Sequence, residues 1–424
     1  MAVQPDHLGA FMSSDGNFIA YSSAFSSPNN TVHTIALLDR KNNTTTLINT
    51  DNSGNAVSSS LFLRGVSNDG NKVLIESDSA IDANDTNGTR DLYLYDRATQ
   101  QSTRVTPNFA AGIQLSQNPF ARARLSGDGQ WVAYPVYDFN NSNFGDIDEI
   151  YLHNVQSAQT HTLPKPAIQF FEERELDSLD ISDDGQTIAF STLSQRDIDF
   201  QFFEVGELYH YDNTTQTTRL IDMPLVQVGP PPYITETHIS GNGEFVFFSS
   251  FNDLLTPNDF NFSADIFRLN LQDDSIDMVS FNETGDQLNF STSEGYSNTN
   301  GNILTFATFA GNIGPNSDPN AFNVPLSLYQ RNIDTGDVTL VSKDITQMPV
   351  SAMGSFSTFA GISDNGDINL FFTAADVLNT GVTPTHPQLY LVNKNVKHIE
   401  LITPPAPFQF SDNNTEKPVW KQSK

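Results

Sequence analysis

The chain has 424 residues, no cysteine, and 50 acidic residues against 21 basic ones, which gives a formal net charge of −29. The lack of cysteine excludes disulfides, thiolate metal sites and cysteine nucleophiles. The negative charge argues against nucleic acid and anionic membrane surfaces as partners, because both repel an acidic protein, and it favours cations. Solubility alone is also a sufficient reason for such a charge.

Location is constrained only by what the sequence lacks. No apolar run approaches the roughly 20 residues that span a bilayer, so we expect no membrane insertion. Residues 1–6 contain neither the basic nor the apolar segment of a signal peptide. The chain therefore either stays inside the cell or is the mature form of an exported protein, and we expect a periplasmic or extracellular location.

The first repeated feature is a four-residue motif, Ser-x-Asp/Asn-Gly, that precedes an apolar strand. Its first copy is residues 13–16, and its weakest copy, residues 298–301, has Asn in place of Ser. Asp-Gly or Asn-Gly between two apolar runs predicts a β-hairpin, and we expect a type I′ turn with positive φ at both central residues. The repeat is marked by seven glycines spaced 54 to 65 residues apart: Gly16, Gly70, Gly129, Gly185, Gly243, Gly301 and Gly366.

The second repeated feature is an apolar–aromatic strand that ends in Asp or Asn. The first copy is residues 35–39 and the last is 389–393, and all seven copies end in a residue type that starts turns. A Thr-rich strand follows each copy, as in residues 103–106. Each unit therefore contains four antiparallel strands, A to D, with no helical period between them.

Units of this kind, repeated radially, form a propeller. The sequence predicts an all-β fold: one seven-bladed β-propeller of four-stranded antiparallel blades over residues 1–403. A meandering sandwich is the structural alternative. Residues 404–424 are Pro-rich and break the repeat, so we expect a flexible C-terminal tail. Docking of this locally basic tail onto the acidic disc or a partner is the other interpretation.

The combination of Ser-x-Asp-Gly, an apolar strand and an Asp-Ile-Tyr-like strand resembles the repeat of TolB-like bacterial β-propellers. The resemblance covers residues 8–403 and implies the fold, but not the function, because that scaffold carries binding proteins, enzymes and assembly parts. Unit one departs from the pattern at Ala36, where the other units have an aromatic residue, and unit six departs at Asn298.

Strand order predicts where function lies. The A–B and C–D turns are short and share one side of the disc, whereas the long B–C and D–A connections share the other, which we call the loop face. Long loops on a rigid scaffold carry binding surfaces. The loop aromatics that we expect to bind a partner are Phe139, Phe144, Phe171, Phe203, Tyr233, Phe260 and Phe262. Alternatively, they pack back as a satellite core.

One loop has the composition of a calcium site. Calcium takes six to eight oxygen ligands, and carboxylate and amide side chains supply them. The candidate ligands are Asp82, Asn84, Asp85, Asn87 and Asp91. Similar clusters lie within residues 138–148 and 258–265. None has EF-hand spacing, and Asp and Asn also fill loops simply because they make turns. We expect no other cofactor.

Catalytic motifs are not found: the chain has no nucleophile elbow, His-Glu-x-x-His or phosphate loop. The weak catalytic candidates are Tyr233, His238, Arg122 and Arg124. The two arginines alternate on one predicted strand, where they either hold a ligand carboxylate or pair with structural acids.

The leading hypothesis is a non-catalytic binding or assembly module that presents an acidic, loop-rich face to a protein or glycan partner. The alternative is a lyase-type polysaccharide-degrading enzyme, because several lyase families use seven-bladed propellers. A His, a Tyr and an Arg around one pocket would favour the enzyme. Acids and aromatics at the channel mouth would favour the binding module.

Overall fold

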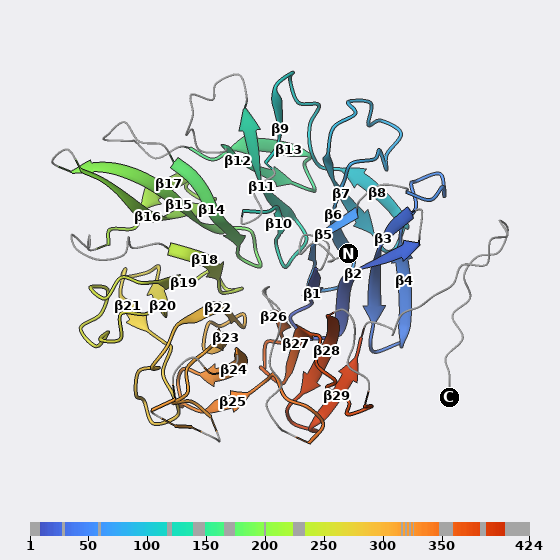
Figure 1. Ribbon diagram of the computed structural model, residues 1–424. Helices are drawn as coiled ribbons and strands as arrows, with labels where there is room; N and C mark the ends of the chain where they lie inside the picture. The colour runs from blue at the N-terminus through green and yellow to red at the C-terminus, as the bar shows by residue number, and fades with distance from the viewer. Residues whose placement is uncertain are drawn as a thin grey trace.

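The computed structural model describes residues 9–27, 30–57, 61–116, 121–138, 149–164, 174–198, 201–223, 234–314, 317–318, 320–321, 324, 326–346, 359–381 and 387–402. Over these residues the chain forms a seven-bladed β-propeller, in which antiparallel sheets stand around a central axis (Figure 1). Each blade uses four strands that follow one another in sequence, and blade 3 adds the short strand β9 beside β11. The predicted fold is confirmed. No helix of the described part is long and apolar enough to cross a membrane.

The strands are as follows. Blade 1 has β1 (Ala10–Met12), β2 (Phe18–Ser27), β3 (Asn30–Asp39) and β4 (Thr44–Ile48). Blade 2 has β5 (Leu61–Val66), β6 (Lys72–Ser77), β7 (Asp91–Asp96) and β8 (Gln101–Arg104). Blade 3 has β9 (Ile113–Leu115), β10 (Arg124–Leu125), β11 (Trp131–Asp138), β12 (Glu149–Asn154) and β13 (Gln159–Thr162). Blade 4 has β14 (Arg174–Ile181), β15 (Thr187–Ile198), β16 (Gln201–Asp212) and β17 (Thr217–Leu220).

The remaining blades repeat this order. Blade 5 has β18 (Ile234–Ile239), β19 (Phe245–Ser250), β20 (Asp265–Asn270) and β21 (Ile276–Met278). Blade 6 has β22 (Thr292–Ser297), β23 (Ile303–Thr308), β24 (Ser327–Asn332) and β25 (Val338–Leu340). Blade 7 has β26 (Phe359–Ile362), β27 (Ile368–Thr373), β28 (Gln388–Asn393) and β29 (His398–Leu401). In every blade, the third of the four sequential strands ends at the Asp or Asn that the second motif predicts.

The Ser-x-Asp-Gly motif closes each A–B turn through its side chains. In blade 1 the Ser13 hydroxyl donates to Asp15 at 2.7 Å and accepts from the Phe18 amide at 2.9 Å, while the Gly16 amide bonds the Ser13 carbonyl. Only the glycine has positive φ, 71° at Gly16, and Asp15 does not. The expected type I′ turn is therefore wrong: the loop is longer than two residues, so a single left-handed glycine completes it.

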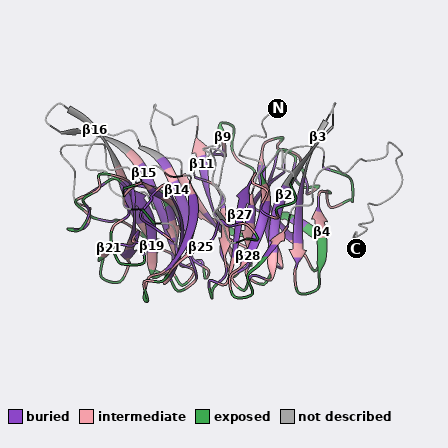
Figure 2. Cartoon of the chain, turned by 60° about the horizontal axis from the view of Figure 1, so that its bottom comes forward, coloured by how far each residue is buried: buried purple, intermediate pink, exposed green. Residues whose placement is uncertain are grey.

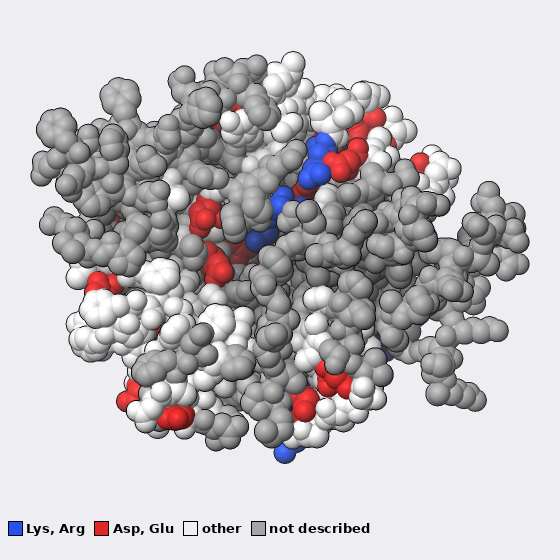
Figure 3. Space-filling view, in the orientation of Figure 1, with Lys and Arg blue, Asp and Glu red and all other residues white. Residues whose placement is uncertain are grey.

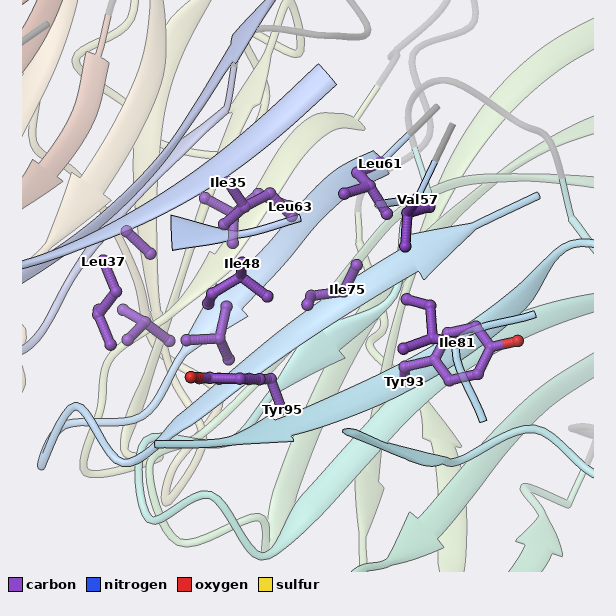
Figure 4. Packing of buried hydrophobic residues seen from close by; sticks show 13 residues of the cluster. Ile35, Leu37, Ile48, Val57, Leu61, Leu63, Ile75, Ile81, Tyr93 and Tyr95 are labelled. Carbon is purple, nitrogen blue, oxygen red and sulfur yellow. The ribbon is translucent and has the colours of Figure 1, made fainter. Parts of the chain in front are cut away.

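Apolar side chains from facing sheets hold the blades together (Figure 4). Ile35, Leu37 and Ile48 of blade 1 share a cluster with residues of blade 2 such as Ile75 and Tyr93. The ring closes in the same way, because blade 7 residues such as Leu391 pack with Ile19 of blade 1. Burial runs through the middle of the sheets, and exposed residues are confined to turns and edges (Figure 2).

Candidate functional site

On the A–B side of the axis, at least one hydrogen bond joins each pair of neighbouring blades. The donors and acceptors lie at, or directly after, the variable second residue of the motif. Going round the ring, these contacts are Ser14 N to Asn68 Oδ1, Asn68 N to Gly127 O, Asp128 N to Asp183 O, Asp183 N to Gly241 O, Asn242 N to Thr299 O, Thr299 N to Asp364 Oδ1 and Asp364 N to Ser14 O. The contact between blades 7 and 1 completes the ring.

Asp183 of blade 4 extends across this ring. Its Oδ2 accepts from the Thr299 hydroxyl of blade 6 at 3.3 Å, and its carboxylate also interacts with Asn68 of blade 2. Glycine is required on both sides, because a Cβ at Gly127 or Gly241 would lie 2.1 or 2.3 Å from the Asp183 oxygens. Burial raises the pKa of Asp183. Side chains of blades 2, 4 and 6 therefore meet at this end of the axis.

Above this ring, the innermost strands carry irregularities at a similar level. The register shifts beside Arg64 in β5, Asp177 in β14 and Glu236 in β18, and β22 and β26 shift as well. Bulges re-aim side chains and are common next to functional sites. Glu236 also has φ of 55°, which is uncommon for a residue other than glycine.

One polar array links blades 3 to 6. His238 Nδ1 lies 2.5 Å from Asp180 Oδ2, which also accepts from the Ile239 amide, and Arg124 Nε lies 3.5 Å from Asp180 Oδ1. The Tyr296 ring packs against His238 with centroids 5.0 Å apart. Although burial opposes the charge, the pKa of Asp180 is below its ordinary value, because His238, Arg124 and the amide favour the carboxylate. Asp180 thus orients the imidazole through Nδ1.

A second array belongs to blade 2. Glu76 accepts from Arg64 Nε at 2.7 Å and from Arg90 Nη1 at 3.1 Å, and Arg90 also pairs with Asp78. Both guanidinium groups lie over the Phe62 ring, 5.2 and 4.8 Å from its centroid. Leu125, which follows Arg124, packs against Gly65, which follows Arg64, so the two arrays are neighbours.

Figure 3 views the loop face. Basic side chains follow a line from its centre toward blade 2, and acidic side chains lie near both ends of that line. The centre of the face therefore combines both signs of charge, although the whole chain is strongly acidic.

The rim of blade 5 presents apolar side chains to solvent. Phe260 and Phe262 are 72% and 81% exposed, and Phe251 and Leu254 of the same B–C loop are also exposed. These four are among only seven exposed large hydrophobic residues in the part of the chain that the structure describes. Phe262 has φ of 53°, a left-handed conformation that costs a residue with a Cβ about 1–2 kcal/mol.

Polar residues of the same loop alternate with these rings and turn inward. Asp259 and Asp265 are buried, and the Gln287 side-chain amide donates to both, at 2.8 and 3.0 Å. The Asn261 amide also donates to Asp265 at 3.0 Å. Burial raises the pKa of Asp259, and it raises the pKa of Asp265 to about 6.

Of the five candidate calcium ligands of blade 2, four lie in one loop and Asp91 begins β7 directly after it. Asp85 accepts from Arg104 and Tyr93, and Asp91 accepts from Thr106. Asp82 and Asn87 accept from amides two residues further on, as in Asx turns. Among the residues with assigned positions, no three histidines or acids converge as metal ligands. Protein donors thus use several oxygens of this loop, although the buried Asp91 Oδ2 and the Thr89 hydroxyl have no hydrogen-bond partner.

Some of the other predicted site residues lie within the described part of the chain and some lie outside it. Phe139, Phe144, Phe171 and Tyr233 lie outside the described residues, as does the tail from residue 404. Phe203 lies in β16, and only its backbone is described, which pairs with that of Arg196 in β15. His238 and Arg124 lie in one array, but Arg122 precedes β10 and so does not alternate with Arg124 on a strand.

Sequence reasoning missed Asp180, Tyr296, Arg64 and Glu76. No sequence motif marks these four residues. Each joins its array only because a neighbouring blade or a bulge brings its partners close.

No protein-family model matches the sequence, and no curated protein is significantly similar to it. The propeller domain of the Trilobed protease from Pyrococcus furiosus superposes with a TM-score of 0.55 at 12% identity, covering 96% of this chain and 98% of that one. An acylaminoacyl peptidase from Pyrococcus horikoshii gives a TM-score of 0.54 at 12% identity. The match includes 94% of this chain but only 52% of that protein, so this chain spans about half of its length. A putative TolB from Agrobacterium tumefaciens gives 0.40 at 15% identity over 72% and 87% of the chains, too low to carry an argument. The similarity is to β-propellers in general, and it shows the fold alone.

Proposed function

We propose that this protein is a non-catalytic binding module whose loop face docks another protein, with the B–C loop of blade 5 at the centre of the contact. The observation that carries the proposal is the exposure of Phe260 and Phe262. Solvent-exposed aromatic rings that cluster with other apolar side chains are typical of interaction surfaces.

A protein partner suits this loop better than a glycan. The four exposed side chains, Phe251, Leu254, Phe260 and Phe262, carry no polar group, whereas a sugar brings hydroxyls that need hydrogen-bond partners. Protein interfaces combine an apolar core with a polar rim. The arginines and acids at the centre of the loop face would supply that rim.

Site-specific photo-crosslinking tests the proposal. A photoreactive phenylalanine analogue at position 260 is expected to give one dominant adduct in the native organism, identified by mass spectrometry. The matched control places the same analogue at Val396, an apolar residue 68% exposed in the C–D turn of blade 7, on the opposite side of the disc. Adducts from position 396 alone, or the same adducts from both positions, would count against the proposal. An adduct with a glycan would show that the partner is a glycan and not a protein.

A second candidate function, the lyase-type enzyme, is favoured by the array around Asp180, because that array brings together a His, a Tyr and an Arg: His238, Tyr296 and Arg124. An oriented imidazole can accept a proton, and an arginine can neutralise a uronate carboxylate. Incubation with a panel of acidic and neutral polysaccharides would test it. Unsaturated products that are formed by the wild type and not by His238→Ala would establish the enzyme. If no polysaccharide of the panel is cleaved, the enzyme is excluded for those substrates.

A further inference from the structure

The B–C loops of blades 2 and 5 are built on the same plan. Asp85, Asn87 and Asp91 in one loop correspond to Asp259, Asn261 and Asp265 in the other. Gly88 and Phe262 occupy the same left-handed position, with φ of 68° and 53°. The last acid of each loop accepts from the hydroxyl that follows the blade's fourth strand, Thr106 in blade 2 and Ser280 in blade 5.

The two loops differ in what neutralises their acids. In blade 2, Asp85 is bonded by the Tyr93 hydroxyl and by Arg104, which are partners on strands β7 and β8. The corresponding partners on β20 and β21 are Phe267 and Met278, and neither can donate a hydrogen bond or supply a positive charge. Met278 is nevertheless next to the acids, since its sulfur lies 3.8 Å from Gln287 Nε2.

Blade 5 is therefore left with buried carboxylates that lack a basic partner among the residues the structure places. Asp259 is only 7% exposed, and its Oδ2 has no donor. The buried Thr256 hydroxyl in the same loop also has no partner. A single side-chain amide, that of Gln287, serves both Asp259 and Asp265. Burying a charge without compensation is costly, so such groups are normally paired or coordinate a metal.

We propose that this loop binds one divalent cation of the calcium type, which takes the place that Arg104 fills in blade 2. Asp259 Oδ2 and the Asp265 carboxylate would be the charged ligands, and the Thr256 hydroxyl and loop carbonyls would be neutral ones. Two carboxylates with neutral oxygens suit calcium, which accepts such mixed sets in flexible geometry. The cation would fix the inward residues and thereby hold Phe260 and Phe262, which alternate with them, in their exposed positions.

Calorimetric titration of chelator-treated full-length protein with calcium chloride tests the proposal. We expect one site with a dissociation constant on the order of 10⁻⁴ M, in the range of sites with few carboxylates. Asp259→Asn should weaken it at least about tenfold. Asp85→Asn, the equivalent change in blade 2, should leave it within about twofold, because Arg104 already neutralises that loop. No calcium heat in the wild type, or an unchanged affinity in Asp259→Asn, would overturn the proposal.

Placing the two blade 2 donors, Tyr and Arg, at the equivalent positions of blade 5 gives an independent test. We expect calcium to raise the Tm of the wild type, because it binds the folded state. The double variant Phe267→Tyr with Met278→Arg brings the hydroxyl and the guanidinium to Asp259, so it should fold without calcium and show neither the binding heat nor the rise in Tm. Retention of both by a folded double variant would contradict the proposal. The cation is measured without any partner, so its failure would leave the docking function standing, and failure of docking would leave the cation site standing.

Discussion

At the scale of single residues, several buried acidic side chains of this protein are paired with a nearby Arg or His. The pKa of Asp180 lies below its ordinary value because His238 and Arg124 face it, and Asp85 forms an ion pair with Arg104 at 3.1 Å. His210 shows the opposite outcome: it accepts a hydrogen bond from Arg219 Nε at 3.1 Å, while Arg219 is itself clamped by Asp274. The sequence predicted the loop that contains Asp85, whereas Asp180 and His210 lie in strands. The pairs join different blades or strands, which no local pattern encodes.

The His210 imidazole gives a pH prediction. Burial, helped by the charge of Arg219, lowers its pKa to about 4, whereas the unfolded chain has the ordinary value of 6.5. The unfolded state therefore binds the extra proton first, so His210 destabilises the fold as the pH falls from 6.5 toward 4. Urea unfolding of His210→Gln at pH 7 and pH 4.5 should show a smaller loss of stability than the wild type. His398→Gln, at an exposed histidine, should match the wild type. Equal losses in all three proteins would refute the assignment.

At the scale of elements, the strands and turns were predictable and the irregularities were not. The seven strands ending in Asp or Asn follow from short motifs that act within one hairpin. The bulges beside Arg64, Asp177 and Glu236 are absent from those motifs. The exposed Phe260 and Phe262 were predicted as binding residues from loop composition, but their alternation with inward acids appears only in the folded loop.

The left-handed conformation of Phe262 gives a prediction about the balance between stability and binding. Phe262→Asn should raise the free energy of unfolding by about 0.5–1 kcal/mol, because Asn tolerates positive φ and the 81% exposed ring contributes little to packing. Gly88→Ala, at the same position of the blade 2 loop, should lower it by about 1 kcal/mol, since nothing lies within 4 Å of the added Cβ and only the backbone is strained. Thermal and urea unfolding measure both changes. A loss of stability in Phe262→Asn would show that the ring is needed for the fold.

At the scale of the whole molecule, seven repeated glycines were enough to predict the number of blades. The side chains that meet at the axis were not predictable, because they come from the variable position of the motif. Asp183 reaches Thr299 across 116 positions of sequence, and it requires glycine at positions 127 and 241. The ring is therefore specified by residues that look interchangeable within any single repeat.

A double-mutant cycle tests this arrangement. Gly127→Ala should destabilise the protein by about 1–3 kcal/mol, because the new methyl would lie 2.1 Å from Asp183 Oδ1 and 2.4 Å from Asn68 Nδ2. Combining it with Asp183→Ala should recover the part of that loss that comes from the carboxylate, which corresponds to a coupling energy above about 1 kcal/mol in urea unfolding. Additive effects of the two changes would mean that the groups do not meet at the axis.

The docking role of the loop face is tested most directly by the affinity of the cross-linked partner for three proteins. Calorimetry should show that Phe260→Ser with Phe262→Ser weakens binding at least about tenfold relative to the wild type, as removal of central aromatic anchors does. Val396→Ser, on the other side of the disc, should bind within about twofold of the wild type. Unchanged binding by the double variant, or a loss confined to Val396→Ser, would contradict the account and place the partner elsewhere.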